Sequence, residues 1–308
     1  PYVPEVSTLF PYGSADSVCN EHRESTRGRD LDITGLSYAI LLDQGPQQWP
    51  MPEGASQGMA RLYANGRFPT PNGRAKFAAM DYHPVAEPRS HDYPYSLNTG
   101  RLRDQWHGMS RTGTLGRLFG HVSEPSIDLN PQDMIQMGLE PGDLVQVTSR
   151  RGEIVIAAQP SDTLAPTQAF IAMHWGEEYL SGMNADAQRR RGVNDLTVSA
   201  FCPTSKQPEL KHAAIRIAPA DLPWRLLAMA WLPATQALSV REALKPLMDR
   251  FAFSTCVPFG REPHAQGKVG VIFRAASMRP TSQDLIQHIE ALMGIDGTDV
   301  MRYQDAHC

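Results

Sequence analysis

The sequence LVQVTSRRGEIVI, Leu144–Ile156, is the clearest indication of the fold. Apolar and polar residues alternate over Leu144–Thr148, as they do in a half-buried β-strand. The pair Arg151-Gly152 is a hairpin signal, and Glu153–Ile156 runs back as a second strand. We therefore expect this part of the chain to be all-β.

The same pattern continues on both sides of the hairpin. Further strands are expected over PYSLNTG up to Gly100, over PSIDLN (Pro125–Asn130), over Ala169–Met173 and over His212–Ile217. One short helix interrupts them, with Asn130 as its N-cap, Pro131 in its first turn and Gly138 at its end. About seven short strands with one inserted helix predict a closed β-barrel over residues 91–220.

Residues 221–308 have a different rhythm. Strands are expected over Trp224–Leu232, Phe253–Val257, Val269–Arg274 and Val300–Tyr303. A capping box at Ser239 predicts the start of one helix, which Pro246 should kink or shorten, and Thr281 with Asp284 predicts the start of another. The resulting order, βαββαβ, is that of a ferredoxin-like split unit. The overall fold class is therefore α+β.

Residues 1–90 hold few periodic segments. Ile33–Leu42 is a plausible amphipathic helix, and most of the remainder is rich in Gly and Pro. Such loops need a larger body to cover than 90 residues supply. Because the chain also opens on PYVPEV without Met and closes on Cys308 soon after an expected strand, we expect it to be a piece of a longer polypeptide.

Composition limits the function classes. The chain has 308 residues, 41% of them hydrophobic, and a net charge of −4, which argues against a nucleic-acid-binding or membrane-binding surface. No apolar run approaches the roughly 18 residues of a membrane helix. The four cysteines, Cys19, Cys202, Cys256 and Cys308, lie far apart, so no CxxC metal motif is encoded and a reducing, cytoplasmic setting is expected.

The densest polar cluster is TGRLRDQWHGMSRTG, Thr99–Gly113. Glycine allows backbone N–H groups to approach an anion, and Arg101 and Arg103 offer forked donors for phosphate or a planar heterocycle. Trp106 and His107 add rings that stack or hydrogen-bond. The cluster suits a phosphorylated, heterocyclic cofactor, and the alternative is a solvated arginine-rich loop.

A second polar cluster follows at GVNDLT (Gly192–Thr197) and at Cys202–Lys211. An Asn amide suits a base edge and a Lys suits an anion, whereas the alternative is a polar loop at a barrel rim. His107 and His174 lack the spacing of known zinc sites, so a structural role is favoured for His174. The motifs GxSxG, GxxxxGKS/T and GxGxxG are absent, so serine-hydrolase, P-loop and Rossmann functions have no support.

Six motifs together resemble the bacterial assimilatory nitrate reductases, a branch of the molybdopterin oxidoreductase family. They are NEHRESTRGRDLDITGLSY (Asn20–Tyr38), GPQQWPMPEG (Gly45–Gly54), FPTPNGRAKF (Phe68–Phe77), TGRLRDQWHGMSRTG (Thr99–Gly113), LEPGDLVQVTSRRG (Leu139–Gly152) and TSKQPELKHAA (Thr204–Ala214). The resemblance covers essentially the whole chain and is least distinctive after residue 222.

The resemblance implies a fold and a set of cofactors. Residues 1–90 would end a central α/β molybdopterin-enzyme domain, 91–220 would form a double-psi β-barrel that binds the molybdopterin dinucleotide, and 221–308 would be the ferredoxin-like unit. The family holds molybdenum through two molybdopterin guanine dinucleotides and usually has a 4Fe–4S cluster, whose ligands lie near the family's N-terminus, outside this sequence. Some relatives carry a 2Fe–2S module further downstream.

The resemblance also implies site residues. The cofactor would contact Thr99, Gly100, Arg101, Leu102, Arg103, Asp104, Gln105, Trp106, His107, Gly108, Asn194 and Lys211. Trp175 occupies a position where the family places a residue near the pocket. We expect these segments to converge on one cleft. No residue is assigned as a metal ligand or as a catalytic acid or base.

The implied reaction is the reduction of nitrate to nitrite in nitrate assimilation, by oxygen-atom transfer to reduced molybdenum. Electrons would come from an NADH-linked flavoprotein, a ferredoxin or a flavodoxin, and the isolated chain would be inactive. Two alternatives remain: another molybdopterin oxidoreductase such as a formate dehydrogenase, and a free-standing β-barrel binding module. A module of that kind for nucleic acid would bind DNA with a steep salt dependence.

Overall fold

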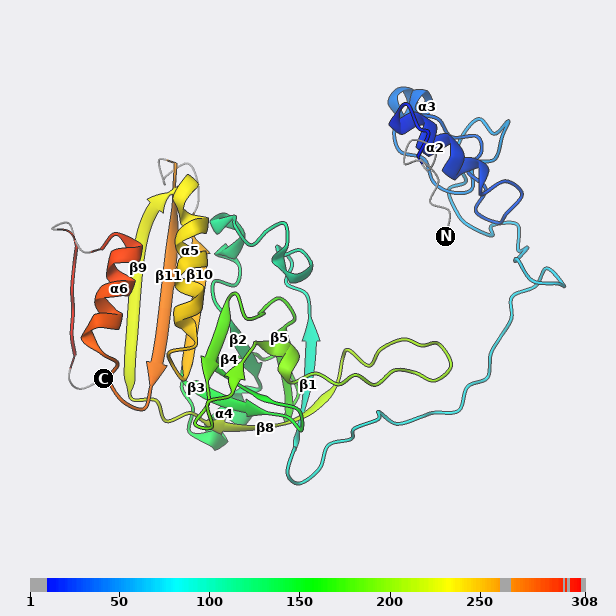
Figure 1. Ribbon diagram of the computed structural model, residues 1–308. Coiled ribbons are helices and arrows are strands. Elements are labelled where there is room, and N and C mark those ends of the chain that lie inside the picture. The colour runs from blue at the N-terminus through cyan, green and yellow to red at the C-terminus, as the bar shows by residue number, and fades with distance from the viewer. Residues whose placement is uncertain (1–9, 261–266, 296, 298–299, 306–308) are drawn as a thin grey trace, which may run out of the picture. The chain divides into compact units, whose positions relative to one another are not determined.

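The computed structural model describes residues 10–260, 267–295, 297 and 300–305, and it divides into two compact units, Pro1–Tyr82 and His83–Cys308 (Figure 1). The first unit holds α2 (Ala15–Glu24) and α3 (Tyr38–Gln44). The second holds β1 (Tyr95–Gly100), β2 (Ser126–Leu129), α4 (Pro131–Met137), β3 (Leu144–Thr148), β4 (Glu153–Pro160), β5 (Gln168–Ala172), β6 (Leu180–Met183), β7 (Arg189–Arg190), β8 (Ala213–Pro219), β9 (Trp224–Pro233), α5 (Ala234–Met248), β10 (Phe253–Phe259), β11 (Lys268–Ser277) and α6 (Gln283–Met293). Three short 3₁₀ helices, η1 (His107–Met109), η2 (Gly116–Gly120) and η3 (Val193–Asp195), lie in its loops.

The first unit has a small core of Ile33, Leu36 and Met51. The helix predicted over Ile33–Leu42 begins only at Tyr38, so its first half is wrong. The cause is local hydrogen bonding: Asp32 Oδ1 accepts from the Thr34 amide at 2.9 Å and holds a turn, and Ser37 Oγ then caps the helix at the Ile40 amide.

The predicted closed barrel is confirmed. Six strands close in the order β1-β5-β2-β4-β3-β8, and every strand expected between residues 95 and 217 is present. Side chains on the inner face of each strand are fully buried, among them Leu97, Ile127, Val145, Ile156 and Ile171. The burial of alternate residues explains why the apolar–polar pattern of the sequence identified these strands.

The predicted caps of α4 are also confirmed. Asn130 Oδ1 accepts from the Gln132 amide at 2.9 Å, and Pro131 occupies the first turn. Gly138 ends the helix with φ of 67°, a left-handed conformation that glycine adopts without strain. The helix closes the end of the barrel opposite to the one described next.

Strand direction gathers several loops at one end of the barrel. Strands β1 and β5 pair in parallel, and β8 runs antiparallel to β1. Strand β2 is antiparallel to β5 and parallel to β4, which in turn is antiparallel to β3. The carboxyl ends of β1, β3 and β5 and the amino ends of β4 and β8 therefore meet. We call this end, formed by residues 101–108, 149–152, 173–176, 193–195 and 211–212, the loop rim.

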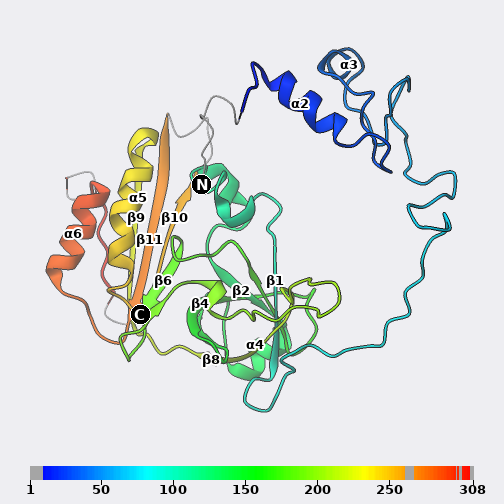
Figure 2. The same ribbon diagram turned by 45° about the vertical axis from the view of Figure 1, so that its right-hand side comes forward.

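A five-stranded sheet, in the order β7-β6-β10-β11-β9, packs beside the barrel. Helices α5 and α6 cover one face of it, with Leu244, Met248, Phe273 and Met293 in the core between them (Figures 1 and 2). Side chains on the other face, such as Val257 and Ile272, belong to the same apolar cluster as the barrel core. Barrel and sheet thus share one hydrophobic core.

The elements β9, α5, β10, β11 and α6 occur in the predicted order, with β11 between β9 and β10 and antiparallel to both. The strand predicted at Val300–Tyr303 is wrong, because residues 300–305 form no strand. Arg302 instead donates to Glu290 of α6 at 3.1 Å. On its other side β10 pairs with β6, which in turn pairs with β7, both from the segment expected to be barrel.

Two helix starts differ from the predictions. Helix α5 begins at Ala234, and Ser239 lies inside it with its hydroxyl donating to the Gln236 carbonyl, so the capping box at Ser239 is wrong. Helix α6 is capped by Ser282 rather than Thr281. Pro246 falls in the last turn of α5, which ends two residues later at Met248, as a helix-shortening proline should.

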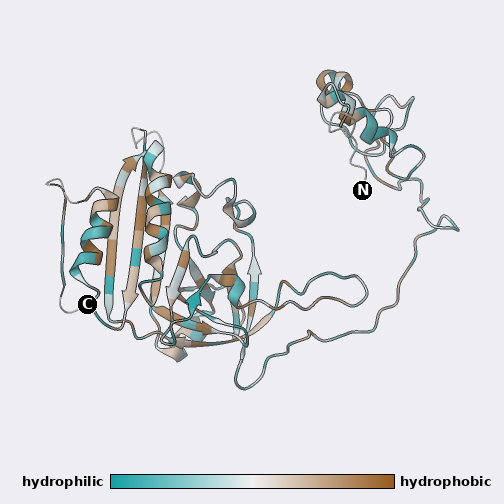
Figure 3. Cartoon of the chain, in the orientation of Figure 1, coloured by the Kyte–Doolittle hydropathy of each residue, from teal (hydrophilic) through white to brown (hydrophobic). Residues whose placement is uncertain are grey.

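Strand β9 is the outer strand of the sheet. Its residues alternate: Ala228, Ala230 and Leu232 are buried beneath the helices, whereas Leu227, Met229 and Trp231 are 48–51% exposed. The apolar colouring of β9 and β11 is visible in Figure 3. The strand therefore presents an apolar row to solvent.

Candidate functional site

The carboxyl end of β1 and the segment before β8 meet at the loop rim. Lys211 Nζ donates to the Thr99 carbonyl at 2.6 Å, and Thr99 Oγ1 donates to the Leu210 carbonyl at 2.7 Å. A Cβ added at Gly100 would lie 2.7 Å from the ring of Phe170, so glycine allows the backbone to pass close to β5. The predicted residues Thr99, Gly100 and Lys211 are thus brought together.

The loop after β1 is joined to the loop after β5 by His174. The imidazole is 1% exposed, and its Nε2 accepts from the Leu102 amide at 3.1 Å. Burial, and after it the charges of His107 and Arg101, lower the pKa of His174 below its usual value. The structural role expected for His174 is consistent with this position, and the ring is neutral at physiological pH.

Asn194 lies at the rim because hydrogen bonds to the backbone of neighbouring residues hold its segment there. The Val193 amide donates to the Trp175 carbonyl at 3.0 Å, and Arg151 Nη2 donates to the Leu196 carbonyl at 3.0 Å. Asn194 itself is exposed in η3. Residues Thr99–Gly108, Asn194 and Lys211 therefore share one end of the barrel and do not lie on opposite faces of it.

The arginines at this end of the barrel differ in whether the guanidinium already has a partner. Arg103 pairs in a bidentate manner with Asp104, at 2.8 and 2.9 Å, and thereby lowers the pKa of that carboxyl. Arg111 lies over the ring of Trp106, 5.3 Å from its centroid. Arg101 is exposed, and within the described residues its guanidinium has no hydrogen-bond or ion-pair partner. Arg101 is the arginine available to a bound anion.

Some of the remaining predicted residues stabilise the loop, and the others are exposed to solvent. Gln105 is buried, donating to the Leu118 carbonyl at 3.1 Å and accepting from Thr112 Oγ1 at 2.6 Å, so it braces the loop. Leu102 packs against the barrel core. Trp106 and His107 are exposed, with their rings edge to face at 5.2 Å, and Gly108 turns the chain with φ of 55°. The displayed set is therefore Arg101, Trp106, His107, Asn194 and Lys211.

One residue that contacts the rim was missed by the sequence interpretation. Glu87 accepts hydrogen bonds from Arg151 at 2.5 and 3.3 Å and lies 3.6 Å from Arg150. It fixes the β3–β4 hairpin turn at the rim. Because its partners stand 63 and 64 positions away in the sequence, no local spacing signals the pairing.

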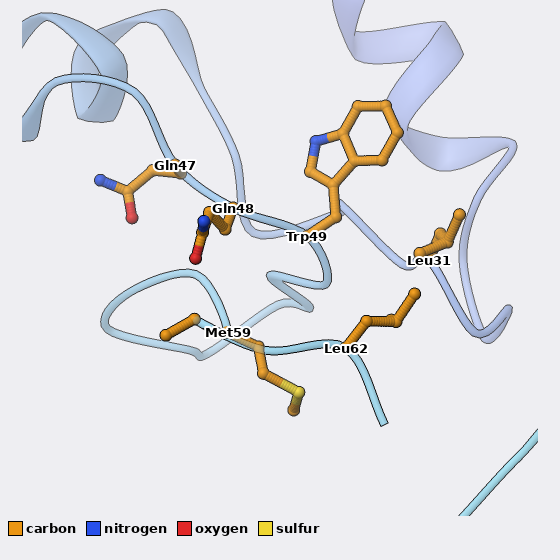
Figure 4. A pocket seen from close by; sticks show the side chains of 7 residues that line it. Leu31, Gln47, Gln48, Trp49, Met59 and Leu62 are labelled. Atoms are coloured by element: carbon orange, nitrogen blue, oxygen red, sulfur yellow. The ribbon is translucent and has the colours of Figure 1, made fainter. Parts of the chain in front are cut away.

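The first unit has a hollow of its own. An open depression of about 470 Å³ is lined by Leu31, Gln47, Gln48, Trp49, Met59, Ala60 and Leu62 (Figure 4). It is built partly from the GPQQWP motif. None of the side chains that line it ionises, so the hollow offers no acid–base chemistry.

Residues 10–260, 267–295, 297 and 300–305 contain no group of three or more His, Cys, Asp or Glu side chains able to hold a metal ion. Within the same residues, no helix has the length and apolar character needed to span a bilayer. Cys308 lies outside the described residues.

A family model described as Molydopterin dinucleotide binding domain matches residues 95–214, which contain barrel strands β1–β5 and the first two residues of β8 and include every displayed residue of the rim. Residues 95–214 are therefore similar to this domain family. The matched range includes the loop rim as well as strands β1–β5.

Curated relatives extend the similarity beyond this domain. The chain is 36% identical to a nitrate reductase of Synechocystis over 68% of its length and 29% of that protein. It is 32% identical to the assimilatory nitrate reductase catalytic subunit of Bacillus subtilis, over 68% of the chain and 28% of the relative. An F420-dependent formate dehydrogenase subunit alpha of Methanocaldococcus jannaschii matches at 32%, again over 68% and 28%. The chain thus spans less than a third of the length of these relatives.

Proposed function

We propose that the loop rim binds the guanine dinucleotide arm of a molybdopterin cofactor, on a barrel of the double-psi type. The residues present fit such a group. Arg101 offers a guanidinium without a partner among the described residues, Asn194 an exposed amide, and Lys211 a second positive charge 2.6 Å from the Thr99 carbonyl. A forked donor and an ammonium suit a diphosphate, and an amide suits a base edge.

We propose further that the chain is part of a nitrate reductase that converts nitrate to nitrite. The observation that carries this proposal is the 36% and 32% identity to nitrate reductases, which continues outside the dinucleotide-binding domain. When bound, the molybdenum cofactor supplies the two-electron chemistry that removes an oxygen atom from nitrate. The residues of this chain supply orientation and charge.

Each displayed residue has a part in that orientation. Arg101 binds the diphosphate, and Lys211 neutralises it while holding the end of β1. Trp106 and His107 present rings against which a heterocycle stacks. Asn194 reads the polar edge of the base. The paired Arg103 and Asp104 keep the loop in shape and contribute little net charge.

The rest of the proposed enzyme follows the resemblance. Residues 1–90 would end the central domain, 91–220 would be the dinucleotide-binding barrel, and 221–308 a ferredoxin-like unit. A 4Fe–4S cluster, with ligands outside the described residues, and in some arrangements a downstream 2Fe–2S module would deliver electrons. The donor would be a flavoprotein, ferredoxin or flavodoxin, and the protein would be cytoplasmic and alone inactive.

The arginines allow a matched test. In the intact enzyme, Arg101→Ala is expected to lower cofactor affinity by about ten-fold or more, since a charge-assisted hydrogen bond is lost. Arg103→Ala serves as the control, because its charge is already paired with Asp104, and should change affinity little. The readouts are molybdenum per polypeptide and the affinity of the 308-residue chain for GMP. Equal behaviour of the two variants would contradict the proposed site.

Lys211→Ala provides a second, independent test. We expect reduced molybdenum content, because both the positive charge and the bond to the Thr99 carbonyl are removed. Lys211→Arg, which keeps the charge, should retain more metal. Unchanged molybdenum in the Ala variant would argue against a cofactor at this rim.

A formate dehydrogenase is the alternative that the 32% identity to the Methanocaldococcus protein favours. The two activities are separated by assaying the intact enzyme with a viologen dye. Nitrate-dependent oxidation of the reduced dye supports nitrate reductase, whereas formate-dependent reduction of the oxidised dye supports the alternative.

A further inference from the structure

His174 occupies a special place in the rim. It lies two residues after the end of β5, and it is only 1% exposed although its ring can be protonated. Its Nε2 accepts from the Leu102 amide at 3.1 Å, and its Nδ1 has no hydrogen-bond partner among the described residues.

The same imidazole contacts the rim segment that displays the binding residues. Leu102, whose amide donates to the ring, directly follows Arg101. His107 and Arg101 lie close enough for their charges to oppose a proton on the ring. One buried side chain thus lies close to both Arg101 and His107.

We propose that neutral His174 is the positioning residue of the loop rim, holding residues 101–107 in the conformation that receives the cofactor. This inference rests on the proposed function for what the loop receives, but not for the contact itself. His174 touches no reacting atom, so its role is to fix the loop through Leu102.

The direction of the hydrogen bond explains why the ring must be neutral. The Leu102 amide is a donor, so Nε2 has to offer a lone pair and the proton must reside on Nδ1. A protonated imidazole would place two donors face to face and release the loop. Burial, His107 and Arg101 all disfavour that proton, with only the backbone of Trp106 favouring it.

The test compares three substitutions that differ in where they place an acceptor. His174→Gln keeps an oxygen at the reach of Nε2, His174→Asn places it at the reach of Nδ1, and His174→Phe keeps a ring without an acceptor. Amide hydrogen exchange at Leu102 is measured in the 308-residue chain, alongside its affinity for GMP. Leaving a buried donor unsatisfied should speed exchange at Leu102 by about ten-fold or more in the Asn and Phe variants. The Gln variant should stay near wild type.

The outcomes separate this inference from the proposed function. Faster exchange at Leu102 in the Asn variant, with recovery in the Gln variant, supports the positioning role even if GMP does not bind. Equal exchange in the Gln and Asn variants overturns it, whether or not the Phe variant folds. If GMP fails to bind the wild-type chain while Leu102 responds as expected, the nucleotide site is wrong and the positioning role stands.

Discussion

At the scale of single residues, environment separates two cysteines of the second unit. Cys256 is buried in β10, and burial raises the pKa of its thiol to about 11. Cys202 lies in the segment between η3 and β8, where hydrogen bonds from Ser205 and the backbone beside it lower the pKa of its thiol. Because the thiolate is the reactive form, the two side chains should react at very different rates.

We predict that iodoacetamide at pH 8 labels Cys202 and leaves Cys256 unlabelled in the folded chain. Mass spectrometry of peptides, sampled over time, measures both rates. The denatured chain is the control and should label both residues alike. Labelling of Cys256 at the rate of Cys202 under native conditions would show that β10 is not the buried strand described.

His174 gives a pH dependence with a definite sign. Its pKa is lowered in the folded chain by burial, His107 and Arg101, so the unfolded chain binds the proton more readily. The free energy of unfolding that this residue contributes is therefore complete above the unfolded pKa, near 6.5, and decreases as the pH falls below it. Unfolding by urea from pH 8 to pH 5 measures the effect. Wild type should lose stability toward acid pH relative to His174→Gln, which has no titrating ring, and a constant difference between the two would contradict it.

Some of these residue contacts were predictable and others were not. The capping bonds of Asn130 and Gly138 are made only to residues close to them in sequence, so their residue types are enough to predict them. Glu87 with Arg151, and Lys211 with Thr99, meet only after the barrel has closed. The composition of Thr99–Gly113 indicated an anion site, but the pairing of Arg103 with Asp104, which leaves Arg101 free, is a matter of geometry.

At the scale of elements, α4 shows how one side chain serves two segments. Asn130 caps the helix through its Oδ1, and its Nδ2 donates to the Leu164 carbonyl at 2.7 Å. The same amide thus starts the helix and fastens the loop before β5.

We predict that Asn130→Ala destabilises the chain by about 1 kcal/mol for the cap, with a further loss for the loop. Asn130→Ser keeps a capping oxygen but no amide donor, and should fall between the Ala variant and wild type. Chemical denaturation followed by circular dichroism compares the three proteins. A Ser variant as unstable as the Ala variant would mean that the cap contributes nothing.

The sequence predicted elements well where apolar residues of a strand are buried and poorly where tertiary contacts decide. The six barrel strands were all predicted, although burial alternates strictly only in some of them, such as β2, and not in β4. Strands β6 and β7 were missed because they are short and are defined by pairing with β10 and with each other. Ser239 resembles a cap in sequence, yet α5 continues through it because its apolar face already begins at Ala237.

At the scale of the whole molecule, Arg190 ties barrel and sheet together. Its guanidinium is buried, donating to the carbonyls of Met183 and Ala252 in the sheet region and to Glu153 Oε1 of the barrel at 2.6 Å. Glu153 begins β4 at the loop rim. A single paired charge therefore bridges the two parts of the second unit.

We predict that Arg190→Met lowers the free energy of unfolding by about 3–5 kcal/mol, because Glu153 and two carbonyls lose a buried partner. The neighbouring Arg189, which is about one-third exposed, is the control, and Arg189→Met should cost no more than about 1 kcal/mol. Urea denaturation measures both. Similar losses in the two variants would refute a special role for the buried pair.

The barrel itself could be predicted from its strands, but the meeting of the rim loops could not. That meeting depends on the parallel pairing of β1 with β5, which brings residues 101 and 173 to the same end. Both loops can be recognised in the sequence, but their proximity in space cannot. Convergence of Asn194 and Lys211 on the Thr99–Gly108 loop was expected only from the family resemblance.

The apolar row on β9 has a practical consequence for work with the chain. Strand β9 lies at the edge of the sheet, and its apolar side chains Leu227, Met229 and Trp231 face water. Exposed apolar side chains together with unpaired backbone N–H and C=O groups favour aggregation in concentrated samples. Because the opposite face of β9 carries the contacts to α5 and α6, Met229→Lys should raise the solubility limit while leaving the melting temperature nearly unchanged. Ala230, the next residue along β9, is buried beneath the helices, so a lysine at that position should instead strongly destabilise the fold.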